Sequence, residues 1–338
     1  MTNRYALALI SGAMMVTAPL MSSSLTARQA PAAAPARAAV TTATVPRTPW
    51  GDPDLQGTWT SEAELSVPFE RGREFGERQT LNDQEFAARV AQTNRQLQSD
   101  NSDFDLETAD RSTAGQVGSA TSPPPHWLER GKTSRRTSIV IDPPDGRIPA
   151  QTQNAQRRAQ GPRGTFGGAS FASWEDLSLW ERCITRGMPG AIFPTVYNAN
   201  TRIVQGPGFV AITYEMIHDT RIIPLDGRPH ANTGIRSYFG DSRGRWEGDT
   251  LVVDVTNFSE KTNYRGSRET LHLIERFTRS GSGLRYEVTA DDPQTWTRPW
   301  TAALDLAPQA EDMFEYACHE GNNSMRNILS GARAAERH

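Results

Sequence analysis

The sequence lacks the motifs that mark several common enzyme classes. Its two cysteines and six histidines show no C-x-x-C, H-x-H or H-x-x-x-H spacing, so the usual sequence signals of a zinc site are absent. No G-x-S-x-G occurs, which removes the nucleophile elbow of the α/β-hydrolases. The glycine-rich stretch 161–170 lacks the Lys-Ser/Thr of a phosphate-binding loop. We therefore expect no metal and no other cofactor.

Charge of one sign and long hydrophobic runs are also scarce. The formal net charge is −3 over 338 residues, which gives no field that would attract nucleic acid. Hydrophobic residues make up only 36 %, and 27 glycines and 22 prolines indicate many turns. After the N-terminal leader no apolar run is long enough to cross a bilayer. These features predict a small-molecule partner, no nucleic acid, and no stable membrane insertion after signal cleavage.

The first 27 residues have the pattern of a secretory signal peptide. Arg4 supplies the positive start, residues 5–21 form an apolar core of secretory length, and small residues follow. Cleavage is expected between about Ser23 and Ala30, and a single uncleaved anchor is the alternative. The sequence thus predicts an exported protein, periplasmic or secreted.

The predicted export indicates that the two cysteines are oxidised. In an oxidising compartment, Cys183 and Cys318 most simply form one disulfide. Closing so long a loop would stabilise the fold by roughly 4–5 kcal/mol in the chain-entropy model. Because His319 adjoins Cys318, a catalytic thiol is the alternative.

The chain divides into four stretches by composition. Residues 1–27 are the leader, 28–48 an Ala/Pro-rich tether, 49–200 an N-terminal extension, and 201–338 a strand-rich region with a terminal helix. The last two are expected to share one domain in part. Helices are expected over 80–100, with Asn82 as N-cap and Glu85 completing a capping box, and over 173–187, with Ser173 as N-cap.

The strand-rich region predicts the fold class. Short runs rich in β-branched and aromatic residues are separated by Gly, Asp-Gly and Asp-Pro turn signals. About eight such strands with brief connections predict a mainly β protein: an antiparallel barrel-like meander with a few peripheral helices. The expected strands lie within residues 201–205, 208–218, 220–227, 249–258, 269–281, 283–292, 295–307 and 312–320.

Two resemblances support the barrel. Gly57-Thr58-Trp59 is similar to the G-x-W signature that opens the first strand of lipocalins. The chain also resembles a set of secreted bacterial proteins of uncharacterised function, a likeness that implies a secreted, calycin-like barrel but brings no catalytic residues. It is carried by residues 49–59, 176–190, 215–230, 240–253, 291–301 and 316–322.

The stretch 209–221 supplies the first site hypothesis. In a continuous or bulged strand, successive side chains point to opposite faces, so His218 would end an apolar stripe that includes Tyr214. Glu215, Asp219 and Arg221 would lie on the other face as surface charges. A hairpin turn at His218-Asp219 is the alternative, and it would invalidate this assignment.

His218 is the first candidate for a catalytic residue. At the rim of an apolar cavity it could act as general acid or base, with Tyr214 or Arg221 polarising the substrate. The alternative is a neutral imidazole that is merely hydrogen-bonded at a strand end.

Four further residues are candidates for substrate binding. Arg228 and His230 follow the Asp226-Gly227 turn, and His319 and Glu320 follow the last expected strand. Solvated turn charges are the alternative for Arg228. A metal site built from His218, His230 and His319 is geometrically conceivable but has no supporting spacing.

Two function classes follow. The first is an exported, cofactor-free enzyme doing acid/base chemistry on a small, partly lipophilic molecule, as a lyase, isomerase or hydratase. The second is a ligand-binding or carrier protein of the cell envelope, in which the same residues only orient the guest. A structural or interaction protein of the envelope is the third possibility.

Overall fold

The computed structural model describes residues 45–100, 131–158 and 171–337. The predicted signal peptide and most of the predicted tether lie outside these residues. The described residues group into one compact unit, which takes strands from both the N-terminal extension and the strand-rich region.

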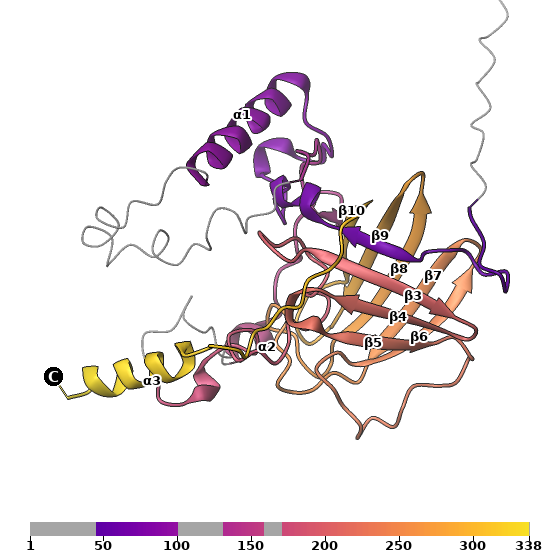
Figure 1. Ribbon diagram of the computed structural model, residues 1–338. Coiled ribbons are helices and arrows are strands. Elements are labelled where there is room, and N and C mark those ends of the chain that lie inside the picture. The colour runs from indigo at the N-terminus through magenta and orange to yellow at the C-terminus, as the bar shows by residue number, and fades with distance from the viewer. Residues whose placement is uncertain (1–44, 101–130, 159–170, 338) are drawn as a thin grey trace, which may run out of the picture. The chain divides into compact units, whose positions relative to one another are not determined.

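Ten antiparallel strands form one sheet with a continuous path of nine strands (Figure 1). The path runs β5-β4-β3-β1-β10-β9-β8-β7-β6, and β2 pairs with β10 beside it. This arrangement confirms the predicted barrel-like meander. The strands are β1 Gly57–Thr60, β2 Val140–Asp142, β3 Asn200–Gly206, β4 Phe209–Tyr214, β5 Thr220–Pro224, β6 Asp241–Glu247, β7 Thr250–Thr256, β8 His272–Ser280, β9 Gly283–Asp291 and β10 Trp300–Pro308.

Side chains, not a backbone ladder, join the two ends of this path. In the described residues, β5 pairs only with β4 and β6 only with β7. A Cβ added at Gly244 of β6 would lie 2.8 Å from Ile223 of β5, so the two strands meet closely. Arg221 of β5 also donates a hydrogen bond to the Ser242 hydroxyl of β6 at 3.3 Å. The barrel is therefore nearly closed, with one seam.

Alternation along each strand fills the barrel interior. In β9, Leu284, Tyr286, Val288 and Ala290 are buried, and the intervening side chains are partly exposed. Their counterparts on neighbouring strands complete one hydrophobic core. The interior is thus packed with side chains, as in other small barrels.

The first strand sits between β3 and β10. Trp59 pairs across to Thr201 and Pro308, and its indole N–H donates to the Leu55 carbonyl at 3.0 Å. Arg279 lies over the Trp59 ring, 4.6 Å from its centroid, and donates to the Asp54 carbonyl. The Gly57-Thr58-Trp59 stretch therefore does open the first strand.

In the part of the chain that the structure describes, the α-helices are α1 Asp83–Asp100, α2 Gln153–Arg157 and α3 Ser324–Ala335. They lie outside the sheet (Figure 1). The predicted capping box of α1 is present, because the Glu85 amide donates to Asn82 and the Asn82 amide donates to Glu85, both at 2.9 Å. In the residues described here, no helix has both the length and the apolar character needed to cross a membrane.

The predicted helix over 173–187 is wrong beyond its first turn. The expected Ser173 cap forms, but only the 3-10 turn η5 Trp174–Asp176 follows. Ser178 and Glu181 then make a second local box, in which the Ser178 amide donates to the Glu181 carboxylate and the Glu181 amide to the Ser178 hydroxyl. These local bonds favour turns over a continuous helix. Cys183 also has a φ of 54°, which a right-handed helix does not allow.

The predicted continuous strand over 209–221 is also wrong. β4 and β5 form a hairpin, with Thr213 opposite Thr220. The reversal contains the 3-10 turn η6 Met216–His218, in which Ile217 and His218 take positive φ values of 64° and 46°. The Glu215 carboxylate stabilises this turn, since it accepts hydrogen bonds from the Asn200 side chain and the Phe314 amide. The turn depends on these contacts with distant residues, so the local sequence 215–219, which contains no glycine or proline, does not predict it.

Two further predictions about strands are wrong. Residues 241–247, which were not among the expected strands, form strand β6, and residues 312–320, expected as a strand, form no regular element. The disulfide between Cys183 and Cys318 is present, so that prediction is confirmed. It joins two irregular segments, not a helix and a strand as expected.

Candidate functional site

A cavity of about 490 Å³ lies beside the barrel, where two irregular segments meet. The first segment covers residues 175–188 and the second covers residues 260–268, and Tyr238 from the connection between β5 and β6 adds to the lining. The lining residues are Glu175, Leu177, Ser178, Leu179, Trp180, Arg182, Thr185, Arg186, Gly187, Met188, Tyr238, Glu260, Lys261, Thr262, Asn263, Tyr264 and Arg268.

The apolar part of the lining is continuous with the barrel core. Leu177 and Met188 are almost completely buried, at 1 % and 0 % exposure. Tyr264 stacks on Trp300 of β10, with ring centroids 6.2 Å apart. Aromatic pairs of this kind fix ring positions, so this wall of the cavity is set by the folded barrel.

The cavity lining carries more positive than negative charge. Arg182, Arg186, Lys261 and Arg268 contribute four cations, and Glu175 and Glu260 contribute two carboxylates. Lys261 and Glu175 lie 3.7 Å apart and join the two lining segments, but both are more than half exposed. An exposed pair of this kind stabilises little.

Arg186 differs from the other lining cations in its surroundings. Its guanidinium lies over the Trp180 ring, 4.7 Å from the centroid, and Nη1 donates to the Met216 sulfur at 3.1 Å. Burial lowers the pKa of Arg186, and the nearby Tyr197 and Tyr316 hydroxyls oppose that effect. Within the described ranges, no carboxylate lies at ion-pair distance from this guanidinium.

Two hydroxyl side chains of the second segment are buried beneath the cavity surface. Thr262 is 4 % exposed, and its Oγ1 has no hydrogen-bond partner in the described part of the chain. Burial raises the pKa of Tyr264 to about 12, although the adjacent Arg265 acts to lower it. An unpaired buried hydroxyl costs free energy, which makes such groups candidates for ligand contacts.

Tertiary contacts hold the first segment in place. The disulfide ties Cys183 to the C-terminal segment, and the Thr185 hydroxyl donates to the Asp219 carboxylate at 2.8 Å. Burial raises the pKa of Asp219, while the Thr185 hydrogen bond and the His218 charge act to lower it. The β4–β5 turn and the disulfide therefore position the residues that line the cavity.

The predicted catalytic residues Tyr214 and Arg221 lie inside the barrel, which corrects the surface position predicted for Arg221. Arg221 makes a two-pronged ion pair with Glu275, at 2.6 and 2.8 Å, and donates to the Tyr214 hydroxyl at 3.0 Å. The Tyr286 hydroxyl donates to the same carboxylate at 2.9 Å. Burial acts to lower the pKa of Arg221, but the Glu275 carboxylate raises it above its usual value.

His218 lies elsewhere, so the predicted catalytic group does not assemble. Its side chain is exposed on the β4–β5 turn, and Nδ1 lies 3.1 Å from the Tyr316 carbonyl. The expected apolar stripe through Tyr214 and His218 does not exist, because the chain reverses between them. The other interpretation, a hydrogen-bonded imidazole at a strand end, describes its position better.

His230 belongs to a polar cluster on the outer face of the barrel. Nδ1 lies 2.8 Å from Asp241, Nε2 lies 3.0 Å from Asp254, and His272 Nε2 lies 3.0 Å from the same Asp254 oxygen. Burial acts to raise the pKa of Asp241, but the Ala231 amide and the His230 imidazole lower it below its usual value. His230 therefore fixes the loop before β6 and does not line the cavity.

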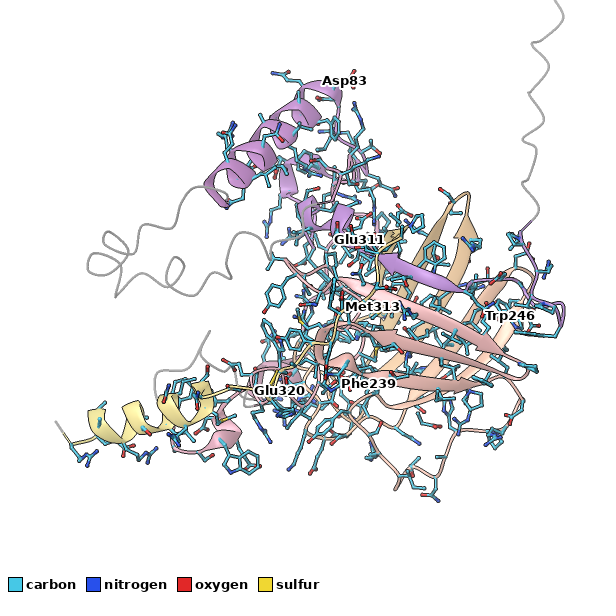
Figure 2. All side chains as sticks on the ribbon, viewed as in Figure 1. Asp83, Phe239, Trp246, Glu311, Met313 and Glu320 are labelled. Atoms are coloured by element: carbon cyan, nitrogen blue, oxygen red, sulfur yellow. A yellow bond between two sulfur atoms is a disulfide. The ribbon has the colours of Figure 1, made fainter. Side chains whose placement is uncertain are left out.

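The other predicted binding residues also lie away from the cavity. Arg228 is exposed and pairs with Asp226 of its own turn. His319 and Glu320 are exposed on the segment that leads into α3, where Figure 2 marks Glu320. The residues His218, His230 and His319 share no site, and no group of three metal-ligating residues is arranged to hold an ion in the ranges given above.

The cavity has no pattern in the sequence, because neither of its two main lining segments forms a strand or a long helix. Arg182 and Arg186 fall within the predicted helix over 173–187, which does not form beyond its first turn, and residues 260–268 were assigned to no element. The useful indication was the number of cations and aromatic residues beside Cys183. Comparison with known proteins adds nothing, since no protein-family model and no curated protein matches the chain.

Proposed function

We propose that the protein binds a small, partly apolar organic molecule in the cavity beside the barrel. This is the ligand-binding or carrier function considered from the sequence, moved from the barrel interior to its edge. The observation that carries it is the cavity itself, whose volume of about 490 Å³ falls in the range typical of ligand sites. An exported location, also a proposal, fits the disulfide that holds one wall.

The composition of the lining favours binding over acid/base catalysis. The partly exposed side chains of Leu179 and Trp180 supply a surface for a hydrophobic body, and the unpaired Thr262 hydroxyl belongs to the same lining. No histidine is among the lining residues, and the two glutamates lie in a lining dominated by cations. The acid/base enzyme centred on His218 therefore stays a prediction without geometric support.

A fluorescence titration tests the proposal. The neutral probe N-phenyl-1-naphthylamine should bind the purified protein with a single saturable site. Leu179→Trp should weaken binding at least tenfold, because the larger ring fills the cavity that Leu179 lines. Val204→Trp is the matched control: Val204 is 47 % exposed on β3, and this variant should bind as the wild type does.

Two results would contradict the proposal. One is the absence of saturable binding in the wild type. The other is an equal loss of affinity in the Leu179 and Val204 variants, which would place the probe outside the cavity.

A further inference from the structure

We propose that the cavity selects an organic anion, a molecule with an apolar or aromatic body and one carboxylate or sulfonate, and that Arg186 binds the anionic group. This inference rests on the proposed function and names the ligand class of the same cavity.

In the described residues, Arg186 has no acidic partner to balance its charge. Two other shielded arginines have acidic partners: Arg221 is paired with Glu275, and Arg136 is paired with the buried Glu64 at 2.9 Å. The buried Arg71 has no ion pair, but its guanidinium donates to two backbone carbonyls and two hydroxyls. Arg186 is partly buried in the cavity wall and has neither an acidic partner nor a set of oxygen acceptors in the described residues. A shielded cation without an acid is costly, so the site gains stability when an anion arrives.

Arg186 can still donate hydrogen bonds to a ligand. Its one protein acceptor in the described chain is the Met216 sulfur, a weak acceptor that engages Nη1. Nε and Nη2 therefore keep donors for a ligand. A guanidinium binds a carboxylate through two parallel N–H donors, which gives both affinity and a fixed orientation.

The charges around Arg186 are mainly positive. Four cations and two carboxylates line the cavity, and one of those carboxylates, Glu175, is already paired with Lys261. The surplus of positive charge attracts anions and disfavours cationic ligands. It also keeps the rim from repelling an incoming acid.

Apolar surface near Arg186 can contact the uncharged body of the ligand. Trp180 lies under the Arg186 guanidinium, and the partly exposed side chain of Leu179 belongs to the same lining. An anionic group at Arg186 thus has apolar surface within reach of its attached body. A small inorganic anion would leave that surface unused and is expected to bind weakly.

A matched probe pair tests the inference. The probes are 11-(dansylamino)undecanoic acid and its methyl ester, which share one body and differ in charge. Wild-type protein should bind the acid at least tenfold more tightly than the ester. Arg186→Gln should abolish that preference and leave ester affinity unchanged, whereas Arg186→Lys should retain part of it.

Arg276→Gln is the matched control, since Arg276 lies on the exposed face of β8 and pairs with Glu247. It should keep the full preference for the acid. Thermal melts of each variant show whether it folds, and the wild-type preference tests the inference even if an Arg186 variant does not fold.

The outcomes separate the inference from the proposed function. If wild-type protein binds both probes equally, the cavity binds ligands but does not select anions, and the inference is overturned. If Arg186→Gln weakens acid and ester alike, Arg186 supports the cavity wall and does not bind the anion. If neither probe binds the wild type, the proposed function itself fails.

Discussion

At the scale of single residues, Arg221 and Glu275 hold the centre of the barrel together. Their ion pair spans β5 and β8, and the hydroxyls of Tyr214 and Tyr286 complete its hydrogen bonds. A buried pair of this kind often adds little net stability over an apolar pair, but loss of one partner is expensive. Its main effect here is to fix how β5 and β8 face one another inside the barrel.

Tyrosine ionisation gives a prediction at the same scale. Burial raises the pKa of Tyr264 to about 12, against about 10 in an unfolded chain. The folded state therefore holds the phenolic proton more tightly, and Tyr264 supports the fold fully below about pH 10. That contribution is lost as the pH rises from about 10 to 12.

Absorbance near 295 nm measures this titration. The substitution Tyr264→Phe should remove one tyrosine ionisation near pH 12 and should leave the ionisation of the other tyrosines near pH 10 unchanged. A loss of signal near pH 10 instead would show that Tyr264 is accessible to solvent. Circular dichroism over the same range distinguishes ionisation in the folded protein from unfolding.

At the scale of elements, the sequence predicted what local chemistry determines. The capping box of α1, the alternation of β9 and most strands of the barrel follow from spacing alone. The stretch 173–187 was wrong because two serine-acid boxes compete with a helix and a disulfide-linked residue sits at positive φ. The β4–β5 reversal was missed because Glu215 supports it through distant partners.

The same logic explains why the candidate site could not be predicted. Tyr214 and Arg221 were predicted to polarise a substrate, but they hydrogen-bond to each other inside the barrel, and the partner of Arg221, Glu275, lies 54 positions further along the chain. The cavity brings together segments whose proximity depends on the closed barrel and on the disulfide. No periodic pattern in the sequence records that proximity.

The turn that leads into β6 gives a prediction at the element scale. Gly240 has a φ of +68°, and a Cβ there would lie 2.5 Å from the Thr256 carbonyl oxygen. Gly240→Ala therefore adds both strain and a clash with backbone, and it should destabilise the fold by about 1–3 kcal/mol.

Gly208 is the matched control, in the β3–β4 turn. It has a φ of +83°, but a Cβ would meet nothing within 4 Å. Gly208→Ala should therefore cost about 1 kcal/mol, from backbone strain alone. Urea unfolding compares the two, and equal losses would contradict the close contact at Gly240.

At the scale of the whole molecule, the disulfide links the cavity wall to the C-terminal segment. The paired variant Cys183→Ser/Cys318→Ser should unfold about 2–5 kcal/mol more easily, since the bridge constrains a long loop of the unfolded chain. It should also weaken probe binding, because Cys183 lies within the segment that lines the cavity.

Two measurements check this prediction. Chemical denaturation gives the loss of stability, and the titration with N-phenyl-1-naphthylamine gives the loss of affinity below the unfolding transition. Unchanged affinity in a folded variant would show that the cavity wall stands without the bridge. A thiol reagent that labels the non-reduced wild type at both cysteines would contradict the bridge itself.

The position of β1 between β3 and β10 determines the order in which the barrel can form. Thr58 bonds to a residue of β3 that lies 144 positions later, and Trp59 pairs with Pro308 of β10, still further along the chain. β1 can therefore find both neighbours only after nearly the whole chain is available, and such distant pairings are slow to form. We expect refolding to be limited by the insertion of β1, on a timescale of about milliseconds to seconds.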